Sequence, residues 1–560
     1  MGRAVIGLVT ATAAGRAAAE TLATRWVDDS RSYPVADLAS AWAECDAVVC
    51  FLAVGATVRL IAPLLADKST DPAVVCVDEA RRFAVPVIGG HHGANALAER
   101  VAETLDATAV LTTATDAAGI PGLDTLGWPY EGEAAAVSRA LLDGEPVALW
   151  TDGQTWPLPA LPAEIVSALP ETGPAILVTD RTDIARPLPS VMLRPPSLTI
   201  GVGASRGVSA AEVLELIRTT LEEENLAPAS IHELATVEAK ADEPGLLEAA
   251  ETLGVALGLH AAEVLADIEV PNPSEIVRAA VETPSVAEAA ALAGGGELLV
   301  TKRKSAMATV AIARRRPRGR LAIVGIGPGD RALLTPQARA ELRRSSVVVG
   351  LDQYVSQVAD LLRPATRVLA TGLGSEQERA ESAVELARGG HAVALIGSGD
   401  AGIYAMASPA LEAADESFDV IGAPGVTAML AAAALLGAPL GHDHAAISLS
   451  DLHTPWEVIE RRVTSAAEGD FVVAFYNPRS RGREWQLAKS LAILAAHRPA
   501  ATPVGIVSDA SRPGQSVVFT TLADVDPNTV GMTSLVIVGA SSSRMAAGRF
   551  VTPRGYTWRQ

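Results

Sequence analysis

The chain has 560 residues, enough for several domains, because single hydrophobic cores rarely grow beyond about 250–300 residues. Hydrophobic residues make up 49% of it and charged residues 20%, a balance typical of layered α/β domains that excludes extended disorder. The net charge of −20 disfavours partners such as nucleic acid or an anionic membrane surface. The longest apolar stretch, Ala428–Leu440, is shorter than the ~20 residues that a membrane span needs.

Three cysteines occur, Cys45, Cys50 and Cys76, without the spacing of zinc ligands. We therefore expect a cytoplasmic protein with reduced thiols and no metal site.

Residues 1–125 alternate short apolar runs with helical stretches rich in Ala, Leu, Glu and Arg. This βα alternation predicts a parallel sheet. The expected strands are Ala4–Val9, Ala47–Ala53, Ala73–Val77, Val85–Ile88 and Ala109–Thr113. Because Ala4–Val9 fits a first buried strand, the N-terminus is not interpreted as a signal peptide.

Three further segments precede the last domain. Prolines become frequent over residues 126–196, which we interpret as a small middle module with strands at Pro146–Trp150 and Ala175–Val178. A second βα unit covers residues 197–313, where Ser209 is the expected N-cap of a helix. Residues 314–320 form a predicted basic linker. Its arginines are Arg314, Arg315, Arg316, Arg318 and Arg320.

Residues 321–560 again alternate strands with helices, and four strands end in loops rich in Gly, Asp, Thr and Asn. These loops are Gly325–Asp330, Gly397–Asp400, Pro424–Ala428 and Tyr476–Arg479. Such loops at the carboxyl ends of strands predict a small-ligand site in an open α/β sheet. The first loop has GxGxG spacing in place of the dinucleotide GxGxxG, with Asp352 near the position of a ribose-binding acid. A nucleotide-dependent oxidoreductase is therefore one alternative.

Residues 321–556 resemble the tetrapyrrole methylases, and among them the precorrin-3B C17-methyltransferases. The resemblance runs in order through LAIVGIGPGD, GSGDAGIYAMA, GAPGVTAMLAAAALLGAPLGHD, ISLSDLHTPWEVIERR, FYNPRSRGREWQL, TPVGIV and VTPRGY. It implies a fold of two α/β halves with S-adenosylmethionine in the cleft, a homodimer, and methylation of precorrin-3B at C17 with ring contraction to precorrin-4. Ala401 departs from the family, which usually has proline there.

The resemblance also implies the site residues. The cofactor contacts would be Pro328, Ser398, Gly399, Asp400, Ile403, Thr427, Ala428, Tyr476 and Ala510. Ring contraction needs a general base, for which Asp443 and Asp451 are the first candidates and His442, His444 and His453 the next. Arginines for the substrate carboxylates would be Arg479, Arg481, Arg483 and Arg554.

Residues 47–116 and 198–313 resemble the two domains of cobalt-precorrin-5A hydrolase, which opens a ring lactone. The polar candidates there are His91, His92, Asn95, Thr115 and Asp116. Two family patterns are altered: G-H-x-G-G-A-N has become Gly89–Asn95, and DEGG has become Asp78–Arg81. The sequence leaves open whether this half is a hydrolase or serves for binding and packing, and whether the substrate carries cobalt. A non-catalytic tetrapyrrole carrier is the remaining alternative for the whole chain.

Overall fold

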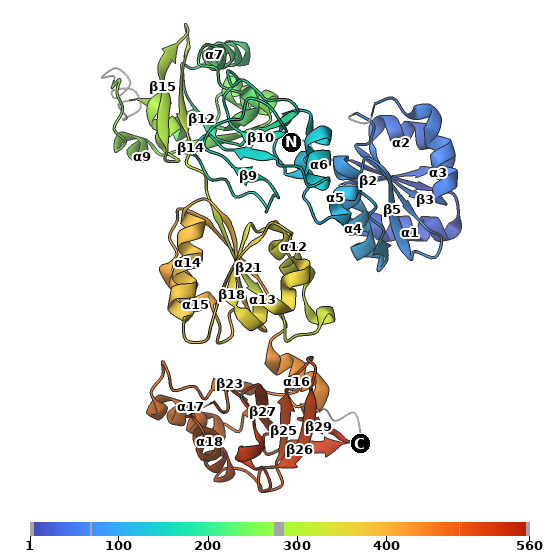
Figure 1. Ribbon diagram of the computed structural model, residues 1–560, viewed down its shortest axis with the longest axis vertical. Helices are drawn as coiled ribbons and strands as arrows, with labels where there is room; N and C mark the ends of the chain where they lie inside the picture. Colours follow the sequence, from blue (N-terminus) through green and yellow to red (C-terminus); the bar gives the residue numbers. More distant parts are fainter. Residues whose placement is uncertain (1–4, 28, 68–69, 274–284, 481, 556–560) are drawn as a thin grey trace. The chain divides into compact units, whose positions relative to one another are not determined.

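The computed structural model describes residues 5–27, 29–67, 70–273, 285–480 and 482–555 (Figure 1). They belong to two compact units. The first consists of Met1–Trp156 and Leu161–Pro317, and the second of Pro157–Ala160 and Arg318–Gln560. None of the helices within the described ranges combines the length and the apolar character needed to cross a membrane.

The first sheet of unit 1 has six strands in the order β2-β1-β3-β4-β5-β6. The strands are β1 (Ile6–Thr10), β2 (Ser30–Pro34), β3 (Ala47–Phe51), β4 (Ala73–Val77), β5 (Phe83–Ile88) and β6 (Thr108–Ala109). The predicted parallel sheet is confirmed at its other strand pairs and is wrong at β5, which runs antiparallel to β4. Only a short turn joins these two strands, and a parallel pair would need a crossover of about a dozen residues or more.

Helices cover both faces of this sheet, as expected for a largely parallel sheet. On one face α1 (Ala13–Arg25) and α4 (Asn95–Leu105) enclose an apolar core with the strands. The other face carries α2 (Leu38–Glu44) and α3 (Val54–Ile61). The short helix α5 (Ala114–Ala117) follows β6.

The middle module contains a five-stranded sheet in the order β7-β11-β10-β8-β9 and one helix, α6 (Ala134–Leu142). Its strands are β7 (Tyr130–Gly132), β8 (Ala148–Trp150), β9 (Glu164–Ile165), β10 (Ala175–Val178) and β11 (Ser190–Leu193). The strand expected at Ala175–Val178 is confirmed residue for residue, and all four of its residues are buried.

A third sheet in unit 1 has the order β14-β13-β12-β16-β15. Its strands are β12 (Leu198–Ala204), β13 (Ile231–Val237), β14 (Ala256–His260), β15 (Glu297–Lys304) and β16 (Ala308–Arg314). The helices are α7 (Ala210–Glu223), α8 (Pro244–Leu253), α9 (Ala262–Ala266) and α11 (Val286–Leu292). Ser209 caps α7 as predicted, because its hydroxyl accepts a hydrogen bond from the Glu212 amide.

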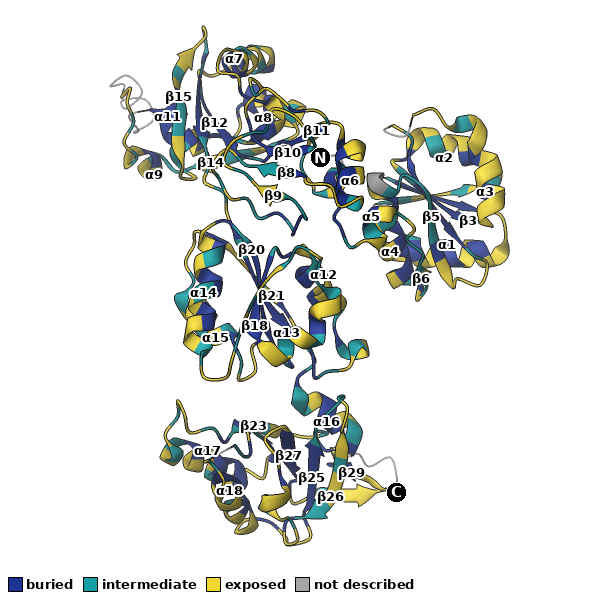
Figure 2. Ribbon diagram, viewed as in Figure 1, coloured by how far each residue is buried: buried dark blue, intermediate teal, exposed yellow. Residues whose placement is uncertain are grey.

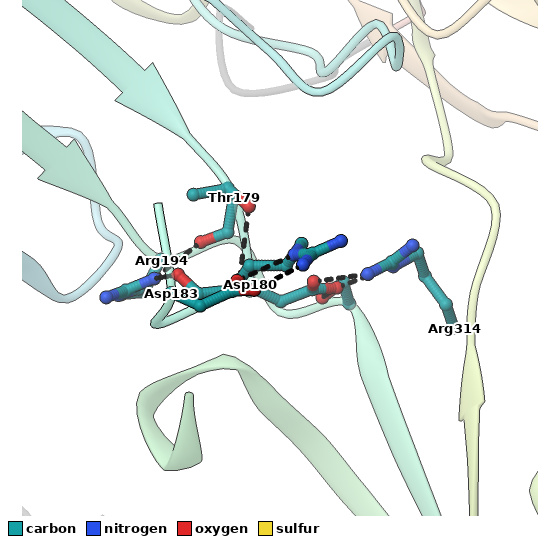
Figure 3. A network of polar contacts seen from close by, with 7 residues as sticks. Thr179, Asp180, Asp183, Arg194 and Arg314 are labelled. Carbon is teal, nitrogen blue, oxygen red and sulfur yellow. Dashed lines mark hydrogen bonds and ion pairs between the residues drawn. The ribbon is translucent and has the colours of Figure 1, made fainter. Parts of the chain in front are cut away.

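A buried carboxylate, Asp180, joins the second and third sheets of unit 1 (Figure 3). It follows β10 and accepts two hydrogen bonds from Arg314 at the end of β16, at 2.8 and 2.6 Å. Ser197 donates a further one at 2.6 Å. Nearby, the buried Arg194 donates to the carbonyls of Thr179 and Arg181. Since a buried charge is costly unless it is paired, this network fixes the two sheets to each other.

Three arginines of the predicted linker are paired within their own units. Arg314 is the last residue of β16 and binds Asp180. Arg318 pairs with Asp419 at 3.0 Å, and Arg320, which begins β17, pairs with Glu341. These guanidinium groups therefore stabilise the ends of the two units.

The first half of unit 2 is a parallel sheet in the order β19-β18-β20-β17-β21. Its strands are β17 (Arg320–Gly325), β18 (Val347–Leu351), β19 (Arg367–Thr371), β20 (Ala392–Gly397) and β21 (Asp419–Ala423). The helices are α12 (Pro336–Arg344), α13 (Asp352–Val358), α14 (Glu376–Arg388) and α15 (Ala407–Ala413). The central strands are buried, as Figure 2 shows. Apolar cores with α14 and α15 on one face and with α12 and α13 on the other account for this burial.

The second half of unit 2 has a mixed sheet in the order β23-β24-β27-β25-β26 and a small sheet in the order β22-β29-β28. The strands of the mixed sheet are β23 (His444–Ser448), β24 (Val472–Tyr476), β25 (Pro503–Ser508), β26 (Ser516–Thr521) and β27 (Ser534–Val538). Those of the small sheet are β22 (Gly437–Ala438), β28 (Arg544–Ala546) and β29 (Arg549–Val551), and the helices are α16 (Ala428–Leu436), α17 (Trp456–Glu468) and α18 (Gln486–Ala495). Since β27 is antiparallel to both β24 and β25, the carboxyl ends of β23, β24 and β25 share one edge.

Candidate active site

Three loops meet at the carboxyl edge of the parallel sheet in unit 2. They follow β17, β20 and β21, which are neighbours in that sheet. The Gly327 amide donates to the Gly399 carbonyl at 3.0 Å, and the Gly399 amide donates back to Gly327 at 2.8 Å. The backbones of the first two loops therefore run in direct contact.

Glycine is required where these loops cross. A Cβ atom on Gly425 would lie 2.0 Å from the carbonyl oxygen of Gly399, and one on Gly325 would lie 2.7 Å from the Gly425 nitrogen. Gly399 itself has a φ of +67°, which side chains disfavour. The three loops thus form a surface made mainly of backbone.

Asp400 holds the second and third of these loops together. One carboxylate oxygen accepts from the Gly402 amide at 2.8 Å, and the other accepts from the Gly425 amide at 3.0 Å. Because each carboxylate oxygen has two lone pairs, Asp400 keeps acceptor capacity for a ligand.

Tyr476, at the carboxyl end of β24, connects the second half of unit 2 to these loops. Its hydroxyl lies 2.6 Å from the Thr427 hydroxyl and accepts a hydrogen bond from the Met429 amide at 3.1 Å. Tyr476 therefore satisfies a free amide at the start of α16. Burial raises the pKa of Tyr476, and the negative charge of Asp400 adds to this rise. The group is thus a neutral hydroxyl at pH 7.

Tyr404 packs beside Tyr476, with ring centroids 5.1 Å apart and planes tilted by 58°. Its hydroxyl donates to the carbonyl of Ala446 in β23 at 2.7 Å, and burial raises its pKa. Tyr404 was not among the residues expected from the sequence. It lies within the GSGDAGIYAMA motif, just after the second glycine loop, but the resemblance did not mark it as a cofactor contact.

The predicted cofactor residues lie around these loops. Ala428, Tyr476 and Ala510 pack against one apolar cluster beneath α16. The Ile403 amide donates to the Asp400 carbonyl at 3.2 Å, and the Ile403 side chain is exposed. Arg512, two residues beyond Ala510, donates to the Pro328 carbonyl at 2.6 Å and to the Ser398 hydroxyl at 2.8 Å. The sequence did not identify Arg512, although it follows a strand in a Ser-Arg-Pro-Gly loop.

The two carboxylates considered as general bases lie at opposite edges of the second sheet. Asp443 precedes β23 at its amino end, with an exposed side chain 3.2 Å from the His442 ring. Since β23 has five residues, the carboxyl edge is about 16 Å away. His444 is the first residue of β23. Asp451 lies beyond the carboxyl end of β23, on the edge where Tyr476 lies.

Two side chains orient Asp451. The Gln486 side-chain amide donates to it at 2.9 Å, and the Arg483 guanidinium approaches it to 3.9 Å. His453, two residues further along, is exposed. The candidates on this edge are therefore Asp451 and His453.

Two of the arginines expected to bind substrate carboxylates have partners within the protein. Arg483 donates to the carbonyls of Leu449 and Asn477, at 3.0 and 2.5 Å, and its burial lowers its pKa. Arg479 donates to the Asn528 carbonyl and pairs with Glu484. Arg554 is exposed, and Arg481 lies outside the described residues.

The first sheet of unit 1 carries a second polar cluster. The Asn95 side-chain amide donates to the Thr113 hydroxyl at 3.0 Å and to the Asp116 carboxylate at 2.7 Å, and Thr113 also donates to Asp116. Among the described residues the buried Oδ1 of Asn95 has no hydrogen-bond partner. Thr115 is buried.

The altered Gly-His segment, Gly90–Ala94, forms a single π-helical turn before α4. The side chains of His91 and His92 lie outside the described residues. Thr113 was not singled out, since it was expected to end a strand that in fact stops at Ala109.

Family models match three parts of the chain. Residues 320–526 match "Tetrapyrrole (Corrin/Porphyrin) Methylases". Residues 36–116 match "Cobalamin synthesis G N-terminal", and residues 198–313 match "Cobalamin synthesis G C-terminus".

Two curated relatives match this chain along nearly their whole length. A "Probable cobalt-factor III C(17)-methyltransferase" from Salmonella typhimurium is 50% identical over 240 residues, 42% of this chain and 99% of the relative. A "Precorrin-3B C(17)-methyltransferase" from Sinorhizobium sp. is 40% identical over 233 residues, 40% of this chain and 91% of the relative. The crystal structure of the methyltransferase CobJ is 38% identical, covering 42% of this chain and all of that one, with a TM-score of 0.41.

Unit 2 is thus a methyltransferase region of mixed α/β architecture, with backbone-rich loops at the carboxyl ends of its strands. The chain belongs to the tetrapyrrole methylase family, and its first half carries two regions of the cobalamin synthesis G type. The predicted α/β multidomain class and the resemblances stated for both halves are confirmed.

Proposed function

We propose that unit 2 transfers a methyl group from S-adenosylmethionine to C17 of precorrin-3B, or of its cobalt-containing equivalent, and contracts the ring. The observation that carries the proposal is the contact between the hydroxyl groups of Tyr476 and Thr427 beside the three glycine loops. The relatives from Salmonella typhimurium and Sinorhizobium sp. bear names that specify this carbon, and this chain covers 99% and 91% of their lengths.

The chemistry of the loops fits S-adenosylmethionine. The loops offer backbone amides and carbonyls, the Asp400 carboxylate, and the rings of Tyr404 and Tyr476. These groups suit a ligand with an aromatic base, hydroxyl groups and a cationic centre. When bound, S-adenosylmethionine supplies an already activated methyl group.

The protein's own task is therefore mainly alignment. Tyr476 fixes the start of α16 through the Met429 amide, and Asp400 fixes the glycine loops. Ring contraction requires in addition that a proton leave a substrate hydroxyl. We assign this step to Asp451 in preference to Asp443, because Asp451 lies at the same sheet edge as Tyr476.

Calorimetry on the full chain tests the cofactor assignment. We expect S-adenosylmethionine to bind, and NADH and NADPH not to bind. Binding of a nicotinamide nucleotide without S-adenosylmethionine would favour the oxidoreductase alternative and overturn the proposal.

For the first half we propose a lactone-opening activity of the cobalt-precorrin-5A hydrolase type. The matched regions and the Asn95–Asp116 cluster support it. A carboxylate held by an amide can orient or activate a water molecule. The hydrolase family that this half resembles releases a two-carbon fragment as acetaldehyde when it opens the lactone. Release of acetaldehyde from cobalt-precorrin-5A should be lost in Asp116→Asn and kept in Asp124→Asn, which changes a carboxylate in the short 3-10 turn Leu123–Thr125. Equal release by both variants would contradict the role of this cluster, and no release by the unaltered protein would favour a binding or packing role.

The altered Asp78–Arg81 segment is compatible with a working fold. It forms the β4–β5 turn, in which Asp78 accepts from the amides of Arg82 and Phe83. Arg81 occupies the position of the last glycine in the DEGG pattern of the hydrolase family, and it adopts a φ of +56°. The turn is therefore kept with some strain.

Five segments are proposed as domains: 1–125, 126–196, 197–313, a linker and 321–560. The extents of the sheets support this division, and the bounds of β16 and β17 favour a linker of residues 315–319. A homodimer through unit 2, implied by the resemblance, is testable by analytical ultracentrifugation.

We propose a cytoplasmic location. The three cysteines are buried and free, and burial raises the pKa of Cys50 to about 12 and that of Cys76 to about 11. Both groups remain thiols at neutral pH, as suits a reducing compartment.

A further inference from the structure

Arg512 lies in the loop between β25 and β26, residues 509–515, and reaches the glycine loops of the other half of unit 2. Its Nε donates to the Pro328 carbonyl at 2.6 Å and one Nη donates to the Ser398 hydroxyl at 2.8 Å. Those two acceptors belong to separate loops, after β17 and after β20. A single guanidinium thus bridges both loops from the second sheet.

The loop that carries Arg512 is held in shape by its own bonds. Asp509 and Ser511 adopt φ values of +50° and +63°, which cost energy for residues other than glycine. The Arg512 amide donates to the Asp509 carbonyl at 2.9 Å, and the Ser511 amide donates to the Gln515 side chain at 2.8 Å. A strained but well-bonded loop presents Arg512 in one direction.

Gly329 provides the space for this arginine. A Cβ atom on Gly329 would lie 2.5 Å from Cγ of Arg512, and the Gly329 φ of +149° lies in the range that favours glycine. Gly329, the last glycine of the Gly325–Asp330 loop, therefore leaves room for the Arg512 side chain, in addition to any contact that it makes with a ligand.

Both hydrogen bonds that the Arg512 guanidinium makes to the described residues end on uncharged groups, a carbonyl and a hydroxyl. Charged donors make hydrogen bonds about twice as strong as neutral ones. Arg512 is therefore well suited to hold loops, and a lysine in its place would have no planar fork to reach two acceptors.

We propose that Arg512 is a positioning residue that fixes the spacing of the loops after β17 and β20, and so pre-forms the cofactor site. The expected effect of Arg512 on cofactor binding rests on the proposed function, whereas its effect on the spacing of the two loops does not. The Tyr476–Thr427 and Tyr404–Ala446 hydrogen bonds join the same two halves at the start of α16 and at β23. Arg512 joins the two halves at a different place, the loops after β17 and β20.

Hydrogen exchange on the full, ligand-free chain tests the loop-holding role directly. In Arg512→Met the amides of Gly327, Gly329 and Asp330 and of residues 398–402 should exchange on the order of tenfold faster, because two charge-assisted bonds are lost. The exchange rates of Arg512→Lys should lie between those of the unaltered protein and those of Arg512→Met. Arg388→Met, which removes an exposed ion pair with Asp415 elsewhere in unit 2, serves as the control and should change neither loop.

Calorimetry with S-adenosylmethionine gives the second readout. Arg512→Met should weaken binding by about tenfold, and Arg512→Lys should weaken it less, because a lysine keeps the charge but lacks the planar fork that reaches both acceptors. Unchanged exchange in both loops of folded Arg512→Met, or equal binding by Arg512→Met and the unaltered protein, would overturn the proposal. If the unaltered protein does not bind S-adenosylmethionine, the proposed function fails, and the exchange data still decide the role of Arg512.

Discussion

The hydroxyl groups of Tyr476 and Thr427 lie 2.6 Å apart, although the two residues are 49 positions apart in the sequence. Tyr476 ends a strand of the second sheet, and Thr427 precedes a helix that follows the first sheet. This contact links the two halves of unit 2 beside the glycine loops, and it underlies the first prediction.

Replacing Tyr476 by Phe removes the contacts to Thr427 and to the Met429 amide while keeping the ring. We expect binding of S-adenosylmethionine, measured by calorimetry, to weaken by about three- to tenfold. Tyr404→Phe keeps both rings and loses a bond to Ala446 only, so it should have a smaller effect. Equal losses in the two variants would argue against a specific role for the Tyr476 hydroxyl.

The two candidate bases can be separated by turnover. Asp451→Asn should lower the turnover number for ring contraction by about 100-fold or more, since a general base typically contributes at least that much. It should leave the affinity for S-adenosylmethionine nearly unchanged. Asp443→Asn should match the unaltered protein in both respects, and the reverse pattern would assign the base to Asp443.

Gly425→Ala should destabilise the loop crossing. The new methyl group would lie 2.0 Å from the Gly399 carbonyl, and such overpacking costs about 2–3 kcal/mol. Hydrogen exchange of the loop after β20 should accelerate accordingly. Gly422→Ala is a matched control in β21, because its Cβ atom would meet nothing within 4 Å. Loops of equal stability in the two variants would refute the close crossing.

Arg81→Gly should stabilise the first sheet by about 0.5–1 kcal/mol. Arg81 has a φ of +56°, and relief of its left-handed strain outweighs the greater freedom of glycine in the unfolded chain. Slower hydrogen exchange of β4 and β5 in urea would measure the gain. Arg81→Lys keeps the strain and should change nothing, so a gain in that variant would point to a different cause.

Continuous apolar runs identified the buried strands well. The strands expected at Ala73–Val77 and Ala175–Val178 have those bounds, because β-branched residues buried on both faces leave a plain signal. The direction of each strand within its sheet was harder to predict. The reversal at β5 depends on a turn held by Asp78, whose hydrogen bonds have no periodic pattern.

Side-chain partners were the least predictable part of the site. No sequence pattern indicated that Arg479 and Arg483 donate to carbonyl groups of neighbouring loops. Their role at the substrate carboxylates stays a prediction. A long side chain can reach many partners, and the fold decides among them. Arg512 and Pro328 are 184 positions apart in the sequence. For the same reason, the contact between them could not be predicted from the sequence.

The most direct measurement of the central claim is the product of the full chain incubated with S-adenosylmethionine and precorrin-3B, with the cobalt-containing substrate in parallel. Mass spectrometry and absorbance should show the gain of one methyl group together with a contracted ring, on at least one of the two substrates. A folded protein that binds S-adenosylmethionine but adds no methyl group to either substrate would contradict the account.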